Sequence, residues 1–344
     1  MSEPRAPGRW TRRRALGIGV AACASLALGG AGVRAFRELA RLHRLRAVRH
    51  RMGTEVAVTV HHTDPVEARR LAGAAFAEIE RLEGILSRHR RGTALDRLNR
   101  EGRLDDAPPE LTGLLTEART YSELTGGAFD ITVAPLLRLY ESAAAGGRLL
   151  GRAEIRATLP LVDYRNVHVE ASTVRLLEPG MEVTLDAIAK GYIADRATAV
   201  LVDGRAVHAM VEAGGDVASA GGSGGTGPWR VGIEDPRVPG AMLGVVELDG
   251  EGAATSGDYR AAFTPDRAAH HILDPRTGHS PGEASAATVV APTASKADAL
   301  STAVLLLGPD AGLALLDATD GTEGLVVGKD GTASRSRGFG RYLA

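Results

Sequence analysis

Apolar residues recur at helical spacing in two long stretches of this chain. Between positions 65 and 86 they return every three or four residues, which predicts one long amphipathic helix. Residues 109–124 show similar spacing and end at Thr125-Gly126-Gly127, a typical glycine-rich helix end. Two further helices are expected, at 187–202 and at 296–307, the second of them ended by Gly308.

Short strands are expected between and after these helices. The first lies at 55–60, where apolar and polar residues alternate. The others are expected at 167–169, 181–185, 209–211, 229–233, 244–248 and 287–290. Several of them follow one another with no helix between, which favours a mixed α+β fold over a doubly wound parallel sheet. The glycine-rich run 221–227 is expected to be a surface loop, because no phosphate-binding lysine follows it.

The first 35 residues carry the pattern of an export signal. Thr11-Arg12-Arg13-Arg14 precedes the apolar run 15–33 and resembles a twin-arginine signal. Three fates fit this segment: lipidation at Cys23, cleavage after Ala35, or retention as an uncut membrane anchor. We expect export across the cytoplasmic membrane and attachment to its outer side. The expected division is a signal or anchor at 1–35, a basic, helix-compatible linker at 36–46, and one folded domain at 47–344.

Composition and charge narrow the class of protein. The chain has 344 residues, 44% of them hydrophobic, so it can bury a sizeable core. Its 41 basic and 42 acidic residues leave a net charge of −1, which provides no overall field to attract nucleic acid. Cys23 is the only cysteine, so the folded part has no disulfide, thiolate metal site or cysteine nucleophile.

Asp298 and Thr302 form the most informative polar pair in the sequence. They stand four residues apart in the expected helix 296–307 and therefore share one face of it. A carboxylate and a hydroxyl in this arrangement are two hard oxygen ligands that suit a partly hydrated Mg²⁺. A second interpretation is open, because Ser295-x-x-Asp298 also fits a helix-capping box.

Four other segments occur with this pair in a fixed order. They are Met52-Gly53-Thr54, GGAFDIT at 126–132, LDAIAKGYIAD at 185–195, and TSGDY through HHILDPRTG at 255–278. Together with 298–302 they resemble the ApbE family, the FAD:protein FMN transferases. The resemblance covers nearly all of the chain after the signal. It implies an α+β, ApbE-like (T-fold-related) arrangement of mixed sheet layers with packed helices.

The resemblance also implies a reaction and a set of partners. Such enzymes use Mg²⁺ to cleave the pyrophosphate of FAD, join FMN through a phosphoester to a threonine of an acceptor protein, and release AMP. The implied acceptor is an FMN-binding domain or a membrane redox subunit. A cation is needed because two adjacent phosphates repel an incoming oxygen nucleophile. The family pattern adds the backbone carbonyl of Ala189 to Asp298 and Thr302 as metal ligands, with Asp298 counted as catalytic.

His271 is the expected general base. A threonine hydroxyl is a poor nucleophile at neutral pH, so a base within hydrogen-bond reach should accept its proton. We expect His271 at the end of a strand, before a turn begun by Asp274. The alternative is that His271 binds a phosphate without taking a proton. Its neighbour His270 should point to the opposite face and serve the structure.

Nine residues are implied to contact FAD. They are Met52, His89, Ala128, Phe129, Asp130, Asp186, Tyr192, Ile272 and Ser301. Ordinary alternatives remain for some of them, since Phe129 could be a core residue and Asp186 a helix cap. Lys190 either faces the diphosphate or is an exposed helix residue. His89 and Glu212 depart from the family pattern, in which an aromatic residue and an asparagine are common.

Two other functions fit the same residues. One is a Mg²⁺-dependent FAD pyrophosphatase, in which water replaces the threonine hydroxyl. The other is an exported flavin-binding protein without catalysis. A further hypothesis concerns residues 249–255, which look like an acceptor sequence and would allow flavinylation of the chain's own Thr255.

Overall fold

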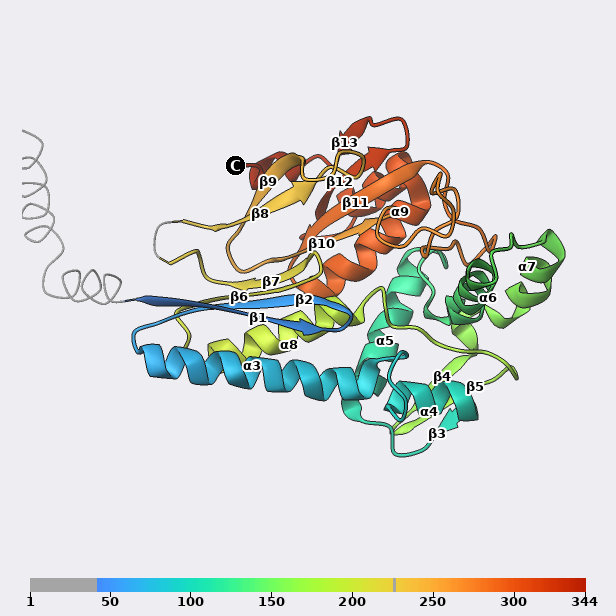
Figure 1. Cartoon of the computed structure of the whole chain (residues 1–344), viewed down its shortest axis with the longest axis horizontal. Helices are drawn as coiled ribbons and strands as arrows, with labels where there is room; N and C mark the ends of the chain where they lie inside the picture. The colour runs from blue at the N-terminus through green and yellow to red at the C-terminus, as the bar shows by residue number, and fades with distance from the viewer. Residues whose placement is uncertain (1–41, 225–226) are drawn as a thin grey trace, which may run out of the picture.

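The computed structural model describes residues 42–224 and 227–344, and an eight-stranded antiparallel sheet forms its centre (Figure 1). The strands lie in the order β1-β2-β6-β7-β10-β11-β12-β13. Their bounds are β1 (His43–Arg51), β2 (Thr54–His62), β6 (His208–Ala213), β7 (Asp216–Ala220), β10 (Gly252–Gly257), β11 (Ala284–Ala291), β12 (Glu323–Gly328) and β13 (Ala333–Arg335).

Two small sheets and seven α-helices complete the described fold. The small sheets contain β3 (Arg103–Leu104), β5 (Thr173–Leu176) and β4 (Val167–Glu170) in that order, and the hairpin of β8 (Trp229–Glu234) and β9 (Met242–Leu248). The helices are α3 (Pro65–Leu86), α4 (Ala94–Glu101), α5 (Pro109–Leu124), α6 (Ala134–Ala145), α7 (Arg152–Thr158), α8 (Ala189–Asp203) and α9 (Ala294–Asp317). The mixed α+β prediction is confirmed.

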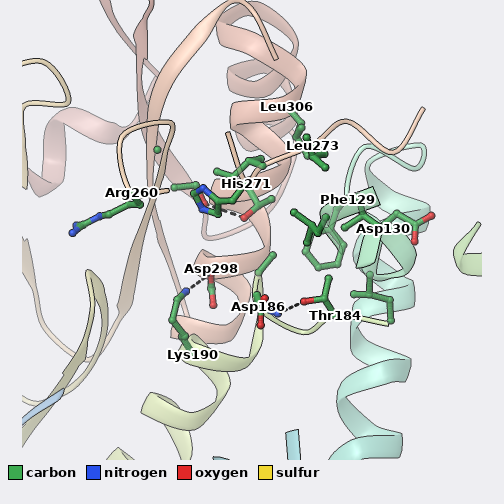
Figure 2. A pocket seen from close by; sticks show the side chains of 18 of the residues that line it. Phe129, Asp130, Thr184, Asp186, Lys190, Arg260, His271, Leu273, Asp298 and Leu306 are labelled. Carbon is green, nitrogen blue, oxygen red and sulfur yellow. Dashed lines mark hydrogen bonds and ion pairs between the residues drawn. The ribbon is translucent and has the colours of Figure 1, made fainter. Parts of the chain in front are cut away.

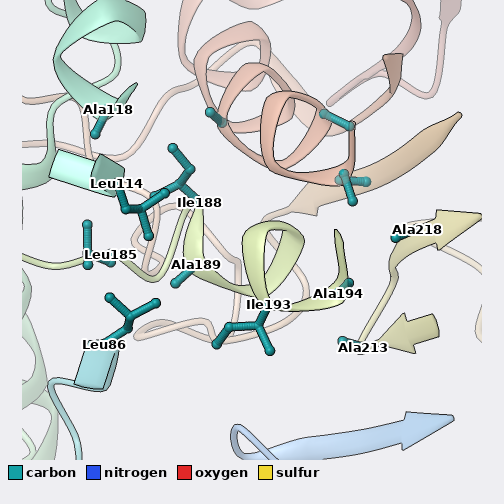
Figure 3. Packing of buried hydrophobic residues seen from close by; sticks show 14 of the residues in the cluster. Leu86, Leu114, Ala118, Leu185, Ile188, Ala189, Ile193, Ala194, Ala213 and Ala218 are labelled. Atoms are coloured by element: carbon teal, nitrogen blue, oxygen red, sulfur yellow. The ribbon is translucent and has the colours of Figure 1, made fainter. Parts of the chain in front are cut away.

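The two faces of the main sheet pack against different layers. Helices α3, α8 and α9 cover one face, and Figure 3 shows α8 among Leu86, Leu114 and Ala213. The hairpin β8–β9 covers part of the other face, where Trp229 is buried. Strand β11 lies between both layers and is buried at every position, which explains its apolar sequence.

Several predicted elements are found close to their expected bounds. Helices α3 and α5 match the predicted ranges, and Asp64 caps α3 by accepting from the backbone N–H of Val66. Helix α9 begins before the predicted start and continues past Gly308. Gly308 has a φ of 79°, so the helix is broken there, but Pro309 starts a second helical stretch.

Two local predictions are wrong. Residues 43–46 were expected to end a helix-compatible linker, but they begin edge strand β1 (His43–Arg51). Most side chains of this exposed edge are basic, and only Leu45 and Ala47 pack against the core, which is too short an apolar alternation to predict a strand. Residues 181–185 form no strand. Instead, the backbone N–H and carbonyl of Val183 bond to the side chain of Asn99, at 2.7 and 2.8 Å. The predicted signal at 1–35 lies outside the described residues.

Helix α9 is also unusually apolar. Within residues 42–224 and 227–344 it is the one helix whose length and mean hydropathy of 1.7 would fit a membrane span. Its residues Ala297, Leu300 and Val304 are fully buried against the sheet and α8. The apolar composition is therefore that of a core helix.

Candidate functional site

The segments singled out in the sequence meet at a cavity of about 450 Å³ (Figure 2). It lies at the end of the main sheet, next to α8, α9 and the segment 128–133. Its lining includes Met52, Phe129, Lys190, Arg260, His271, Asp298 and Thr302. Residues more than 200 positions apart therefore share one site, as the prediction required.

Asp298 is buried inside this site and does not cap its helix. The N-cap of α9 is Thr293, whose hydroxyl accepts from the backbone N–H of Lys296 at 3.2 Å. Ser295 lies within the helix and donates to Glu117 at 2.9 Å. Asp298 is 2% exposed and accepts from the backbone N–H of Gly191 at 3.1 Å. The capping-box alternative is wrong.

Gly191 allows α8 to approach α9 closely enough for this contact. A Cβ at position 191 would lie 2.2 Å from the carbonyl oxygen of Ala294, which is closer than any side chain tolerates. Asp195, one turn further along α8, accepts from the backbone N–H groups of Ala294 and Ser295 at 2.9 and 2.8 Å. The string GYIAD thus joins the two helices that hold the site.

Two buried carboxylates share one ammonium group at the base of the cavity. Lys190 Nζ lies 2.5 Å from Asp216 Oδ2 and 3.5 Å from Asp298 Oδ1. Burial, together with repulsion from Asp216, raises the pKa of Asp298 to about 7. Burial by itself would lower the pKa of Lys190, but the two carboxylates outweigh this effect and raise the pKa above its usual value. Lys190 is therefore not an exposed helix residue.

This donor set fits a divalent cation. When both carboxylates are ionised, Lys190 neutralises only one of them, so one negative charge is left over in a buried site. Thr302 Oγ1 lines the same cavity and lies 2.9 Å from Ser256 Oγ. Ala189 begins α8, two residues before the Gly191 N–H that meets Asp298. Carboxylate, hydroxyl and carbonyl oxygens are the ligands that Mg²⁺ prefers.

His271 is held so that one ring nitrogen is free to act. It lies in a bend next to an isolated bridge between His270 and Ala262, not in the expected strand. The carbonyl of Ala261 accepts from the backbone N–H of His271 at 2.9 Å and lies 3.2 Å from its Nδ1. A carbonyl only accepts, so we assign the ring proton to Nδ1, and Nε2 keeps its lone pair. Burial lowers the pKa of His271, which favours the neutral imidazole.

The neighbours of His271 have structural roles, as expected. His270 is fully buried, and burial lowers its pKa to about 4. The backbone carbonyl of Asp274 accepts from the backbone N–H of Gly278 at 2.7 Å. The side chain of Asp274 accepts from the backbone N–H of Arg276. This is the predicted turn.

Six of the nine implied FAD contacts line the main cavity. They are Met52, Ala128, Phe129, Asp130, Asp186 and Ile272. Met52 and Gly53 form a two-residue hairpin loop with φ values of 52° and 72°, which presents Met52 to the site. Phe129 is also a core residue, with its ring centroid 6.2 Å from that of Tyr121. The side chain of Asp130 already accepts from Thr132 and Tyr164, so its oxygens serve the local fold.

A neighbouring cavity of about 400 Å³ extends the site. It shares Met52, Gly53, Asp186 and Lys190 with the main cavity and is lined by His89 and Ala189 as well. Asp186 does not cap α8, whose N-cap is Ile188. Asp186 Oδ2 instead accepts from Arg88 Nε at 2.6 Å and lies 3.5 Å from His89 Nε2. Desolvation raises the pKa of Asp186, but the contacts with His89 and Arg88 outweigh this effect and hold the pKa below its usual value.

Two implied contacts lie behind the cavity wall. Ser301 is fully buried, donates to the carbonyl of Asp298 at 2.9 Å, and lies 2.8 Å from Ser256 Oγ. Tyr192 lies on α8, half-buried against the core, and burial raises its pKa. Neither residue lines the two cavities, and Ser301 supports the site through its contact with Asp298. Three further charged residues have no motif that marks them in the sequence, and their charges converge on the site only in the fold: Arg88, Asp216 and Arg260.

Known proteins resemble this chain over most of its length. A sequence model of the ApbE family matches residues 52–326. The FAD:protein FMN transferase of Treponema pallidum is 30% identical over 346 residues, covering 94% of this chain and 93% of that protein. The protein of that name from Klebsiella pneumoniae is 29% identical, covering 81% of this chain and 87% of its own.

Solved structures agree in fold. The ApbE protein of Thermotoga maritima has a TM-score of 0.80 and 30% identity, and the match covers 88% of this chain and all of that one. The flavin transferase ApbE of Vibrio cholerae has a TM-score of 0.76 and 25% identity, with the same coverage. With these matches and the assembled site, the chain belongs to the ApbE family.

Proposed function

We propose that this protein is a flavin transferase that moves the FMN part of FAD to a threonine hydroxyl of an acceptor protein and releases AMP. Relatives named FAD:protein FMN transferase support the flavin transfer. The observation that carries the proposal for this chain is the meeting of Asp298, Thr302 and His271 in one cavity. A cation site and a base are the two parts that this reaction requires.

Asp298, Thr302 and the carbonyl of Ala189 would hold Mg²⁺. The bound ion would neutralise the pyrophosphate and align the attacked phosphorus. Asp216 and Lys190 position the buried carboxylate of Asp298 through the contacts described above. Lys190 also lines both cavities and supplies a positive charge toward any diphosphate that lies between them.

His271 would accept the proton of the acceptor hydroxyl at Nε2. The threonine oxygen then forms a bond to the phosphorus of FMN, while the phosphorus–oxygen bond to AMP breaks and AMP leaves with that electron pair. The bond from Nδ1 to Ala261 keeps the ring in one orientation. His271 is therefore proposed as the catalytic base, and binding of a phosphate without proton transfer is the alternative.

One assay separates this function from its alternatives. Purified protein is incubated with FAD, Mg²⁺ and an FMN-binding acceptor domain, and the acceptor is examined on a gel for covalent flavin fluorescence. We expect fluorescent acceptor with Mg²⁺ and none with chelator or with a threonine-to-alanine acceptor. Free FMN with an unlabelled acceptor would indicate a pyrophosphatase. Intact FAD would indicate a binding protein.

We further propose that the acceptor lies on the outer side of the cytoplasmic membrane, as an FMN-binding domain or a membrane redox subunit. The twin-arginine pattern at 11–14 and the apolar run 15–33 support export and attachment. Fractionation of cells into cytoplasm, membrane and exported fractions tests this, and protein confined to the cytoplasm contradicts it. Self-flavinylation of Thr255 stays a prediction, for which mass spectrometry of the protein after FAD and Mg²⁺ is the test.

A further inference from the structure

His271 lies in a loop that has little secondary structure of its own. Residues 258–272, named here the His271 loop, leave the main sheet after β10. One isolated bridge, Ala262 with His270, joins the two arms of the loop, and the backbone N–H of His271 donates to the carbonyl of Ala261. So short a pairing is not stable alone, and the position of the ring therefore depends on what the loop is fastened to.

Asp258 is a buried carboxylate at the start of this loop. It is fully buried, and its backbone N–H donates to the carbonyl of Ser285 in β11 at 3.0 Å. Its two carboxylate oxygens each accept from Arg237, both at 2.8 Å, and Lys329 Nζ lies 3.0 Å from Oδ2. Arg267 approaches to 4.0 Å, the limit of an ion pair. Three cations thus surround one carboxylate.

These cations come from three separate segments. Arg237 lies in the turn between β8 and β9, Lys329 follows β12, and Arg267 lies near the tip of the His271 loop. The tip is also bonded to the other two segments: Arg267 Nη1 donates to the carbonyl of Pro236 at 2.9 Å, and Lys329 Nζ donates to the carbonyl of Arg267 at 3.2 Å. Asp258 therefore lies where the loop meets two turns of the β-layers.

The charge of Asp258 allows the three segments to meet. In residues 42–224 and 227–344, Asp258 is the one carboxylate within ion-pair distance of these three cations. Burial by itself would raise the pKa of Asp258, but the contacts with Arg237 and Lys329 outweigh this effect and hold the pKa below its usual value. Without the negative charge, three half-buried cations would repel one another, and the loop would separate from the turns.

Other contacts hold the loop without Asp258. The ring of Phe263 stacks on Tyr140 with centroids 5.4 Å apart. Ser280 Oγ accepts from the backbone N–H of His270 at 2.8 Å and donates to its carbonyl at 2.9 Å. Loss of the Asp258 charge should therefore shift the first arm of the loop and leave the protein folded.

A shift of the first arm would change the chemistry of His271. Asp258 stands three residues before Ala261, whose carbonyl lies 3.2 Å from Nδ1 of the ring. Arg260 of the same arm and His271 both line the main cavity (Figure 2). The bond at one ring nitrogen decides which nitrogen carries the proton. If the carbonyl moves away, the proton can occupy Nε2, and an Nε2 that carries a proton cannot accept another.

We propose that Asp258 is a positioning residue for His271. By holding its three cations, it keeps the carbonyl of Ala261 on Nδ1 and leaves Nε2 free to accept a proton. The inference rests on the proposed function, in which His271 is the base. Asp258 lines neither of the two cavities, so it acts through the loop and without contact with FAD.

Asp258→Asn tests the proposal because it keeps the size of the side chain and removes its charge. We expect the kcat for transfer to an FMN-binding acceptor domain to fall about tenfold, with the KM for FAD unchanged. Nitrogen NMR of the apo protein with isotope-labelled histidines gives a second readout, in which His271→Ala identifies the signal. The wild type should show the Nδ1–H tautomer of His271, and Asp258→Asn should show a mixture.

Glu323→Gln is the matched control. Glu323 is a largely buried carboxylate of β12 that accepts from the backbone N–H of Gly338 at 2.9 Å and from the hydroxyl of Ser336. It lines neither cavity. We expect this variant to lower the midpoint of thermal unfolding but to leave kcat and the tautomer of His271 unchanged.

A second variant, Arg237→Gln, removes the strongest partner of Asp258 and should change both readouts in the same direction. The double variant should have a kcat no lower than that of Asp258→Asn, because both changes act through one contact. If Asp258→Asn does not fold, Arg237→Gln decides by the same two measurements.

The positioning role is refuted if Asp258→Asn keeps either the wild-type tautomer or the wild-type kcat, or if Glu323→Gln changes both as much. A wild-type ring that carries its proton on Nε2 would overturn it as well. Failure of the wild type to label any acceptor refutes the proposed function instead. The NMR comparison needs neither FAD nor acceptor and still decides whether Asp258 positions the ring.

Discussion

Asp298 of α9 accepts a hydrogen bond from the backbone N–H of Gly191 in the first turn of α8, at 3.1 Å. The contact joins the implied metal ligand to the helix that carries Lys190. It requires close approach of the two helices, which the absence of a side chain at Gly191 permits. The geometry of the cation site thus depends on helix packing.

Asp298→Asn should abolish flavin transfer while leaving the apo protein at least as stable as the wild type. The change removes a metal ligand, yet it also removes the repulsion between two buried carboxylates and leaves Lys190 paired with Asp216. Transfer and thermal unfolding are measured in parallel, the latter with chelator present. Transfer at the wild-type rate would refute the metal assignment.

His271→Ala should lower kcat by roughly 10²- to 10⁴-fold and leave the KM for FAD nearly unchanged. In the wild type, activity should fall with acid as the imidazole gains a proton. Because burial lowers the pKa of His271, the midpoint of this fall should lie below the usual histidine value of about 6.5. With Mg²⁺ saturating at every pH, so that the bound ion keeps Asp298 ionised, a pH–rate profile of the variant should lack this acid limb. An unchanged limb would mean that His271 binds phosphate only.

Gly191→Ala should destabilise the fold by about 1–3 kcal/mol and weaken Mg²⁺-dependent transfer. The added methyl would meet the carbonyl of Ala294 and force α8 and α9 apart. Gly73→Ala in α3 is the control, because a Cβ there has no described atom within 4 Å and alanine favours a helix. Denaturant unfolding and Mg²⁺ titration of both variants provide the comparison. Equal stability of the two would contradict the packing argument.

His270 should make the fold sensitive to acid. Its folded pKa is lowered to about 4, so between pH 6.5 and 4 the unfolded chain binds a proton that the folded chain does not. The contribution of neutral His270 to the free energy of unfolding is therefore complete above the unfolded pKa. It is lost as the pH falls through the folded pKa, and a shift of this size corresponds to roughly 3 kcal/mol. His270→Gln should show a shallower pH dependence of the free energy of unfolding.

Asp195 is a second group that titrates in this pH range, and its effect on the stability has the opposite sign. Burial raises its pKa to about 6, so its contribution to stability is lost as pH rises through that value. The difference between wild type and His270→Gln isolates the histidine, since Asp195 is present in both. Parallel curves for the two proteins would exclude His270 as the group responsible.

The sequence by itself determined the elements whose signals are local. Helices α3 and α5 follow from apolar spacing, with Pro65 or Pro109 at the start. The shared face of Asp298 and Thr302 follows from the helical period alone. Neighbours along a helix have a fixed spacing, so their relationship needs no knowledge of the rest of the chain.

Only the tertiary structure decided which distant charges meet. Lys190 pairs with Asp216, and Arg88 contacts Asp186, although neither pair is adjacent in the chain. Arg260 likewise lines two cavities, the main one and one beside the hairpin β8–β9, that are formed by separate segments. Strand β1 was identified only through its pairing with β2, since most of its side chains are basic and its apolar alternation is limited to Leu45 and Ala47. Such partners depend on how the strands and helices pack, and a pattern along the sequence records only local neighbours.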